Sequence, residues 1–123
     1  MKKYIAINMN EFLTDDELLE MANLSPKTTG IDGVCLWIGP APERHGNRIK
    51  VSNVPDKFER NDCFVITIPD LKTKGRINAK FITADKLKQI KKWIVKNEDV
   101  ILKYSDLEIG TEEMISQLQK IKG

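Results

Sequence analysis

The side chains best suited to chemistry gather in one segment of the sequence, residues 44–51. This segment holds the only histidine of the chain and two of its four arginines. Gly46-Asn47 is typical of a turn, and the alternation of Ile49 and Val51 with polar residues after it is typical of a half-buried strand. Guanidinium groups offer a planar fork of donors that matches phosphate or carboxylate oxygens. The segment therefore predicts an anion-binding site at a turn and along the strand that follows it.

The candidate site draws on this segment and on the strand before it. Its ligand-binding residues are Arg44, His45, Asn47, Arg48 and Lys50, with Trp37 as a stacking surface for a base. In a strand, Arg48, Lys50 and Ser52 share one face, and the backbone amides of a turn that contains glycine can approach an anion. A second interpretation is open as well, because cations on a hairpin edge also keep strands of different molecules from pairing.

His45 is the residue that could give this segment a catalytic role. A histidine titrates near neutral pH, so His45 could act as a general acid or base while Arg48 and Lys50 stabilise a phosphate. The carboxylates, however, are dispersed, and the two cysteines lie in no recognisable catalytic motif. The sequence contains no phosphate-binding loop, dinucleotide fingerprint or zinc-ligand spacing. We therefore predict a site without a metal or a cofactor, and keep catalysis by His45 as an alternative.

Four strands are expected to position the candidate site. They cover residues 34–38, 48–52, 63–68 and 77–81. The third expected strand is almost wholly apolar, which is typical of a strand inside a sheet. The fourth rests on the alternation of Ile77, Ala79 and Phe81 with polar residues. Short connections between the strands favour antiparallel neighbours.

Helices are expected before and after these strands. A capping box at residues 14–17 and the apolar residues after it predict a helix to residue 24, which the following Ser-Pro pair ends. Thr83 is a candidate N-cap for a second helix, which either continues past Asn97 or breaks there and restarts. A last helix is expected from Glu112 onward, with apolar residues through Ile121 on one side.

Length and composition indicate one domain of the α+β class. The chain has 123 residues, enough to bury a core, and divides into a helical region (1–29), a sheet region (30–82) and C-terminal helices (83–123). We predict a small, mainly antiparallel sheet of three or four strands with helices packed on one face. No apolar run suits a membrane span or a signal peptide, so a cytoplasmic location is expected. Cys35 and Cys63 fall in apolar runs, so we predict that they are core or sheet residues without a redox or metal-binding role.

Charge is unevenly distributed along the chain, although the formal net charge is only +2. Residues 1–33 hold three lysines and six acidic residues, a net of −3, whereas residues 71–103 hold ten basic and three acidic residues, a net of +7. Such asymmetry can steer an anionic partner towards one side of a protein. A solvated, lysine-rich helix face is the alternative explanation.

The order of these motifs resembles that of a group of uncharacterised small bacterial and prophage proteins. These share an RHG-x-RIKVS-like loop and strand, an apolar strand and a helix that bears a tryptophan. The matching residues are Arg44, His45, Gly46, Arg48, Lys50 and Trp93. More distantly, the chain resembles a domain-of-unknown-function family with a histidine-rich loop, some members of which lie beside toxin–antitoxin genes. His45 is the only histidine here, which weakens any transfer of catalytic or metal chemistry from that family.

Taken with this resemblance, the sequence predicts a non-enzymatic binding protein of phage or mobile-element origin. The expected partner is anionic, namely a nucleic acid, a nucleotide signal or an acidic protein surface, and the expected role is counter-defence, the inhibition of a host defence system. Two alternatives are a ribonuclease-like toxin that uses His45 and a protein-interaction module of a toxin–antitoxin system. No membrane partner is expected, and a homodimer is a further candidate assembly.

Overall fold

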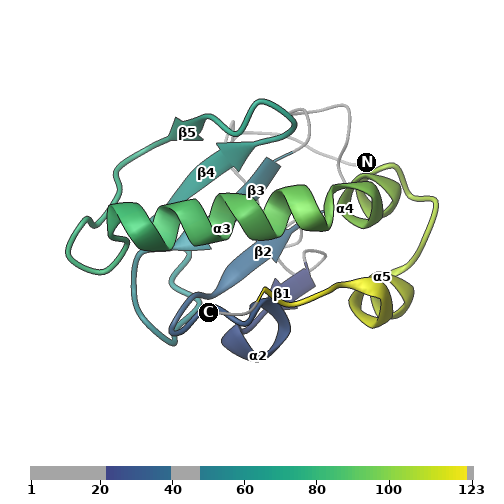
Figure 1. Ribbon diagram of the computed structural model, residues 1–123, viewed down its shortest axis with the longest axis horizontal. Helices are drawn as coiled ribbons and strands as arrows, with labels where there is room; N and C mark the ends of the chain where they lie inside the picture. Colours follow the sequence, from purple (N-terminus) through teal and green to yellow (C-terminus); the bar gives the residue numbers. More distant parts are fainter. Residues whose placement is uncertain (1–21, 40–47, 122–123) are drawn as a thin grey trace, which may run out of the picture.

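The structure of the protein is a computed structural model, which describes residues 22–39 and 48–121 (Figure 1). The described elements are β1 (Ala22–Leu24), α2 (Pro26–Thr29), β2 (Leu36–Ile38), β3 (Arg48–Ser52), β4 (Cys63–Thr67), β5 (Thr73–Lys74), α3 (Ala84–Lys96), α4 (Glu98–Ser105) and α5 (Thr111–Gln117). Among these helices, none is long and apolar enough to cross a membrane.

The sheet is antiparallel throughout, with the strand order β1-β2-β3-β4-β5. Strands that follow one another in sequence are therefore neighbours in space, as short connections favour. The predicted α+β class and antiparallel sheet are confirmed, but the described sheet has five strands rather than three or four. Strand β3 is the central strand, with hydrogen-bonded neighbours on both sides. The candidate-site residues Arg48 and Lys50 therefore belong to a strand that is held at both edges.

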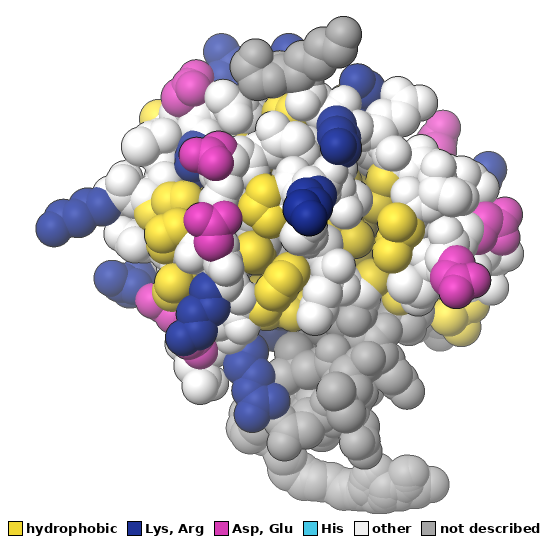
Figure 2. All heavy atoms as spheres, turned by 90° about the horizontal axis from the view of Figure 1, so that it is seen from below, with side chains coloured by type: hydrophobic (Ala, Val, Ile, Leu, Met, Phe, Trp, Pro, Cys, Tyr) yellow, Lys and Arg dark blue, Asp and Glu magenta, His cyan; other side chains and the backbone are white. Residues whose placement is uncertain are grey.

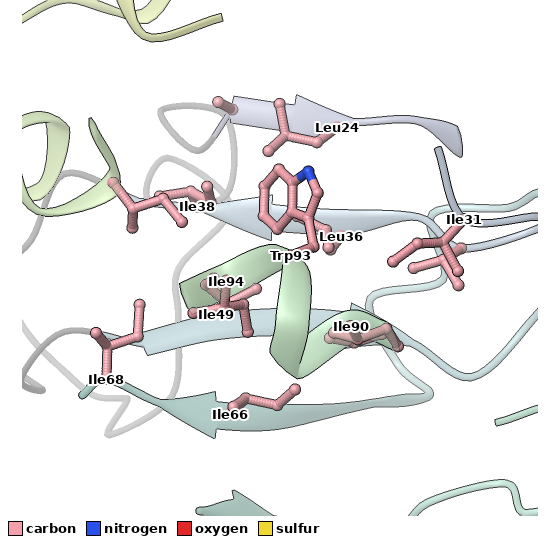
Figure 3. Close-up of a cluster of buried hydrophobic side chains, with 14 of the residues drawn as sticks. Leu24, Ile31, Leu36, Ile38, Ile49, Ile66, Ile68, Ile90, Trp93 and Ile94 are labelled. Carbon is pink, nitrogen blue, oxygen red and sulfur yellow. The ribbon is translucent and has the colours of Figure 1, made fainter. Parts of the chain in front are cut away.

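The core forms between one face of the sheet and α3, which crosses that face (Figures 1 and 3). Ile90, Trp93 and Ile94 of α3 are fully buried. Figure 3 shows the Trp93 indole directed towards Leu24 and Leu36, with Ile90 and Ile94 on the same side of the helix. Each such side chain contributes roughly 1.5–3 kcal/mol when it leaves water. The indole nitrogen of Trp93 has no hydrogen-bond partner, so its ring serves the core by its volume.

Helix α3 begins and ends at residues that satisfy its terminal backbone groups. The Thr83 hydroxyl accepts the Lys86 amide at 3.2 Å, as an N-cap does. Asn97 then separates α3 from α4, so of the two possibilities left open by the sequence the break is the correct one. The Asn97 side chain donates to the Trp93 carbonyl at 2.9 Å and accepts the Gln119 amide at 2.7 Å. It therefore joins the helix break to the C-terminal segment.

The residues after α5 run back along the molecule in an extended form instead of continuing the helix. The predicted last helix begins as expected after Gly110 but ends at Gln117. Ile121 is buried and donates its amide to the Thr29 carbonyl at 3.1 Å. Gly30 has a φ of 80°, and a Cβ there would lie 2.5 Å from the Ile121 carbonyl oxygen. Only glycine fits both requirements at this position.

The predicted strand over residues 77–81 is wrong. The chain instead forms the two-residue strand β5 earlier, at Thr73–Lys74, and then turns. Asn78 ends the extended course, because its carbonyl accepts the amides of both Phe81 and Ile82. Ile77 and Phe81 still pack against the core, but from a turn. Ala79 between them is exposed, so the alternating pattern here corresponds neither to a strand nor to burial of every second residue.

The predicted helix over residues 14–24 is wrong at its end. Residues 14–21 lie outside the described residues, but Ala22–Leu24 form β1, which pairs with β2 and buries Ala22 and Leu24 in the core. The Ser-Pro pair expected to end a helix begins one instead. Ser25 accepts the Lys27 amide as the N-cap of α2, and proline occupies the first helical position, where its missing N–H costs nothing.

Candidate anion-binding face of the sheet

Strand β3 divides its side chains between two environments. Ile49 and Val51 are fully buried on the core face, whereas Arg48 and Lys50 are half-buried on the opposite face. The predicted strand over residues 48–52 is therefore confirmed with the same bounds. Its alternation puts the two cations on the side of the sheet that α3 does not cover.

The register of the sheet shows which residues accompany these cations. Lys50 is paired with Val65 on β4, and Val65 with Lys74 on β5. Arg48 is paired with Thr67. We call the side chains on this side of β3, β4 and β5 the basic face; its members are Arg48, Lys50, Cys63, Val65, Thr67 and Lys74. Neighbouring strands are about 4.8 Å apart, so the Cα atoms of Lys50 and Lys74 are separated by about 10 Å.

The pKa of the Cys63 thiol is affected by both cations of β3. Burial raises the pKa of the Cys63 thiol above its ordinary value, while the nearby charges of Lys50 and Arg48 act in the opposite direction. The carboxylate of Asp62 also contributes to the rise. Electrostatic coupling to Lys50 and Arg48 means that both positive charges lie close to the thiol, on the same side of the sheet. The thiol itself stays protonated near neutral pH.

A carboxylate lies at the Thr67 end of the basic face. The Thr67 hydroxyl donates a hydrogen bond to Asp70, and this bond, with Lys72 nearby, holds the pKa of the Asp70 carboxyl below its usual range. Asp70 therefore keeps its negative charge to a lower pH than an ordinary aspartate does. Because like charges repel, an anionic ligand is expected to sit towards Lys50 and Lys74 rather than over Thr67.

The other end of this side of the sheet is closed by the connection between β3 and β4. The Phe58 ring meets the Trp37 ring edge to face, with centroids 5.5 Å apart, and the Glu59 amide donates to the Ser52 hydroxyl at 3.3 Å. Trp37 is only 4% exposed and Ser52 is fully buried. A stacking role for Trp37 would require Phe58 to move, and it stays a prediction. Trp37 does share a sheet side with Lys50, to which it is paired.

The two cysteines flank Ser52 on this same side and remain free thiols. Ser52 is paired with Cys63 on one side, and its amide donates to the Cys35 carbonyl on the other. Two strand spacings, about 10 Å, therefore separate the cysteine Cα atoms, which is beyond the reach of a disulfide. Burial also raises the pKa of the Cys35 thiol, and the carboxylate of Asp56 adds to the rise.

Half of the candidate site predicted from the sequence lies outside the described residues. These members are Arg44, His45 and Asn47, and the described members are Trp37, Arg48 and Lys50. Within the described ranges, no group of three histidine, cysteine, aspartate or glutamate side chains is placed to hold a metal ion. Lys74 and Cys63 are the residues that the sequence reasoning missed. Alternation along β4 could have pointed to Cys63, but Lys74 depends on β5, a strand too short to recognise.

One edge of the molecule carries charges of both signs. Figure 2 views the edge on which α2 and α5 lie, and there lysine and arginine side chains are interspersed with acidic ones and with small apolar patches. Between β3 and α3, the guanidinium of Arg76 lies 3.3 Å from the Asp62 carboxylate, and the Lys57 ammonium lies 3.3 Å from the Glu59 carboxylate. Exposed pairs of this kind contribute about 0–1 kcal/mol.

A scan against protein-family models, a search of curated proteins and a search of solved structures each returned no match. The resemblance to prophage proteins and to a histidine-rich family therefore stays a prediction.

Proposed function

We propose that the protein binds an anionic ligand on the basic face of its sheet and performs no reaction there. The observation that carries the proposal is the arrangement of Arg48, Lys50 and Lys74 on one side of β3–β5, the side opposite the core. Arginine supplies a fork of donors and lysine a mobile point charge, and the two together suit phosphate oxygens.

The size of the arrangement favours a compact anion. Lysine side chains are long enough for Lys50 and Lys74, with Cα atoms about 10 Å apart, to reach one group held over Val65 between them. Arg48 is two residues from Lys50 along the strand, or about 6.8 Å. Three cations around a single phosphate match a nucleotide signal better than an extended polyanion. A nucleic acid and an acidic protein surface are the other anionic partners, and the test below separates them.

The biological setting belongs to the same proposal. A phage or mobile-element origin depends on the predicted resemblance to prophage proteins, and sequestration of a nucleotide signal is one way to inhibit a host defence system. A ribonuclease-like reaction depends on His45, which lies outside the described residues, so no observation favours it over binding.

The experiment is a titration of the whole chain with each probe, monitored by calorimetry and by the NMR chemical shifts of the backbone amides in β3–β5. Probes are inorganic phosphate, adenosine triphosphate, a short single-stranded RNA and an acidic peptide, each at low and high salt. Arg48→Glu and Lys50→Glu are the test variants, and Lys27→Glu on α2 is the matched control, because it makes the same charge change at an exposed site away from the sheet.

We expect the nucleotide to bind and to shift the Lys50 and Val65 amides. Each test variant should weaken binding by about tenfold or more, the loss of roughly one charge-assisted contact, and a cooperative thermal melt should show that the variant is folded. The control should bind as the wild type does. Absence of binding by every anion at low salt would refute the proposal, and so would full binding by Arg48→Glu. Binding of the peptide alone would favour the protein-interaction alternative.

A further inference from the structure

The exposed side of α3 carries a regular row of lysines. Lys88, Lys92 and Lys96 are exposed and follow one another at intervals of four residues, while the buried side of the helix packs into the core. A helix rises 1.5 Å per residue, so neighbouring lysines of the row are about 6 Å apart and the row is about 12 Å long. We call these three residues the α3 lysine row.

The positive charge of this row is not neutralised by ion pairs. Helix α3 contains five lysines and one acidic residue, a net of +4. Among the described residues, salt bridges join Lys57 to Glu59 and Arg76 to Asp62, and neither involves α3. Lys96 donates to the Lys120 carbonyl at 3.0 Å, which leaves its charge in place.

Within α3 and α4, the acidic side chains lie at the two ends of the row. Asp85 lies in the first turn of α3, where it accepts a hydrogen bond from Gln89 at 3.2 Å. Glu98 and Asp99 lie in the first turn of α4. The helix dipole favours a carboxylate in a first turn, so these residues have a structural reason to be there. Between Asp85 and Glu98, every charged side chain of α3 is a lysine.

The row and the basic face lie on opposite sides of the sheet. Helix α3 covers the side of β3 that carries Ile49, as Figure 3 shows, whereas Arg48 and Lys50 project from the other side. One small anion cannot touch both surfaces. The row is therefore independent of the site to which the proposed function is assigned.

We propose that the α3 lysine row binds the phosphate backbone of a nucleic acid without reading its sequence. Evenly spaced point charges match a continuous line of phosphates, and backbone contacts carry no sequence information. Protein interfaces, in contrast, are depleted in lysine and rely on buried apolar or arginine anchors. Val95 is the one exposed large apolar side chain of α3. A duplex presents twice the charge density of a single strand and is the tighter-binding form.

The test is fluorescence anisotropy with a labelled DNA duplex of about 20 base pairs, its single strand and an acidic peptide, between about 50 and 200 mM salt. If three lysines contact phosphates, log K should fall with log salt with a slope of about −2.7. The double variant Lys88→Glu with Lys92→Glu should bind at least about tenfold more weakly, with a slope near −1. Lys27→Glu is the control and should bind as the wild type does.

The outcomes separate this inference from the proposed function. Duplex binding that survives Arg48→Glu but is lost in the double variant supports the α3 lysine row. Loss of duplex binding in Arg48→Glu would overturn it, because the nucleic acid would then lie on the basic face. The inference is also overturned if the duplex fails to bind at low salt, if the double variant binds normally, or if the acidic peptide alone binds. A thermal midpoint equal to that of the wild type shows that the double variant is folded.

Discussion

Replacement of Asn53 by alanine should destabilise the protein more than most single substitutions. The Asn53 side chain is 1% exposed and connects three segments of the chain. Its amide nitrogen donates to the Asp62 carboxylate and to the Arg76 carbonyl, both at 2.9 Å, and its amide oxygen accepts the Asn78 backbone N–H at 2.9 Å. The side chain therefore ties the end of β3 to the β3–β4 connection and to the segment that follows β5.

The expected cost follows from these three bonds. Each hydrogen bond contributes about 1 kcal/mol net, which gives about 3 kcal/mol for Asn53→Ala. The bond to Asp62 has a charged acceptor, which would strengthen it, but that carboxylate is 41% exposed and water can replace the lost donor. The Arg76 carbonyl and the Asn78 N–H lose their partner in the protein. For a chain of this length, about 3 kcal/mol corresponds to a fall of about 10 °C in the thermal midpoint.

The assay is urea denaturation followed by tryptophan fluorescence, with a thermal melt as a second measurement. The urea concentration at the midpoint should fall, while the slope of the unfolding free energy against urea concentration stays constant. This result would show that stability changed and that the surface exposed on unfolding did not. Asn61→Ala is the control, because Asn61 is exposed in the same connection and the change should cost less than about 0.5 kcal/mol. If Asn53→Ala costs less than about 1 kcal/mol, this network does not hold the connection in place, and the reasoning is wrong.

Two further predictions concern the basic face. Alkylation by iodoacetamide at about pH 8 should modify the half-buried Cys63 and spare the buried Cys35. Lys50→Ala should slow the reaction of Cys63, because removal of the cation raises the pKa of this thiol further. Equal rates in the variant and the wild type would show that Lys50 does not act on the thiol. Thr67→Ala should raise the pKa of Asp70 towards its ordinary value in a carboxyl-carbon NMR titration. A carboxyl pKa that folding lowers contributes stability at pH values above the ordinary carboxyl range, and this contribution is lost as the pH falls. The variant should therefore lose less stability on acidification than the wild type does. An unchanged titration of Asp70 would refute the role of Thr67.

The strands that could be predicted were those whose side chains divide between two environments. Strand β3 alternates strictly, with apolar residues towards α3 and cations away from it, and the expected bounds were confirmed. The N-cap at Thr83 was equally recognisable, because capping depends on a few neighbouring residues. Signals of both kinds are local, so the sequence is enough to find them.

Strands that depend on a distant partner were missed. Ala22–Leu24 follow helix-forming residues in sequence and become β1 only because β2 offers them hydrogen bonds and a place in the core. Residues 77–81 show the reverse, since their sequence alternates as a strand would but the chain forms a turn in which the Asn78 carbonyl accepts the Phe81 and Ile82 amides. Local preference amounts to a few tenths of a kcal/mol per residue, and tertiary contacts outweigh it.

The sequence is enough to place Arg48 and Lys50 on one side of a strand, because side-chain direction alternates along any strand. It is also enough to direct Lys88, Lys92 and Lys96 towards water, since the apolar residues of α3 recur on one side. The surroundings of these side chains depend on contacts between distant segments. The register brings Lys74 and Cys63 beside Lys50, and the packing of Phe58 buries Trp37. The packing of α3 on one side of the sheet separates the α3 lysine row from the basic face, and neighbours across a sheet follow from pairing that no local pattern encodes.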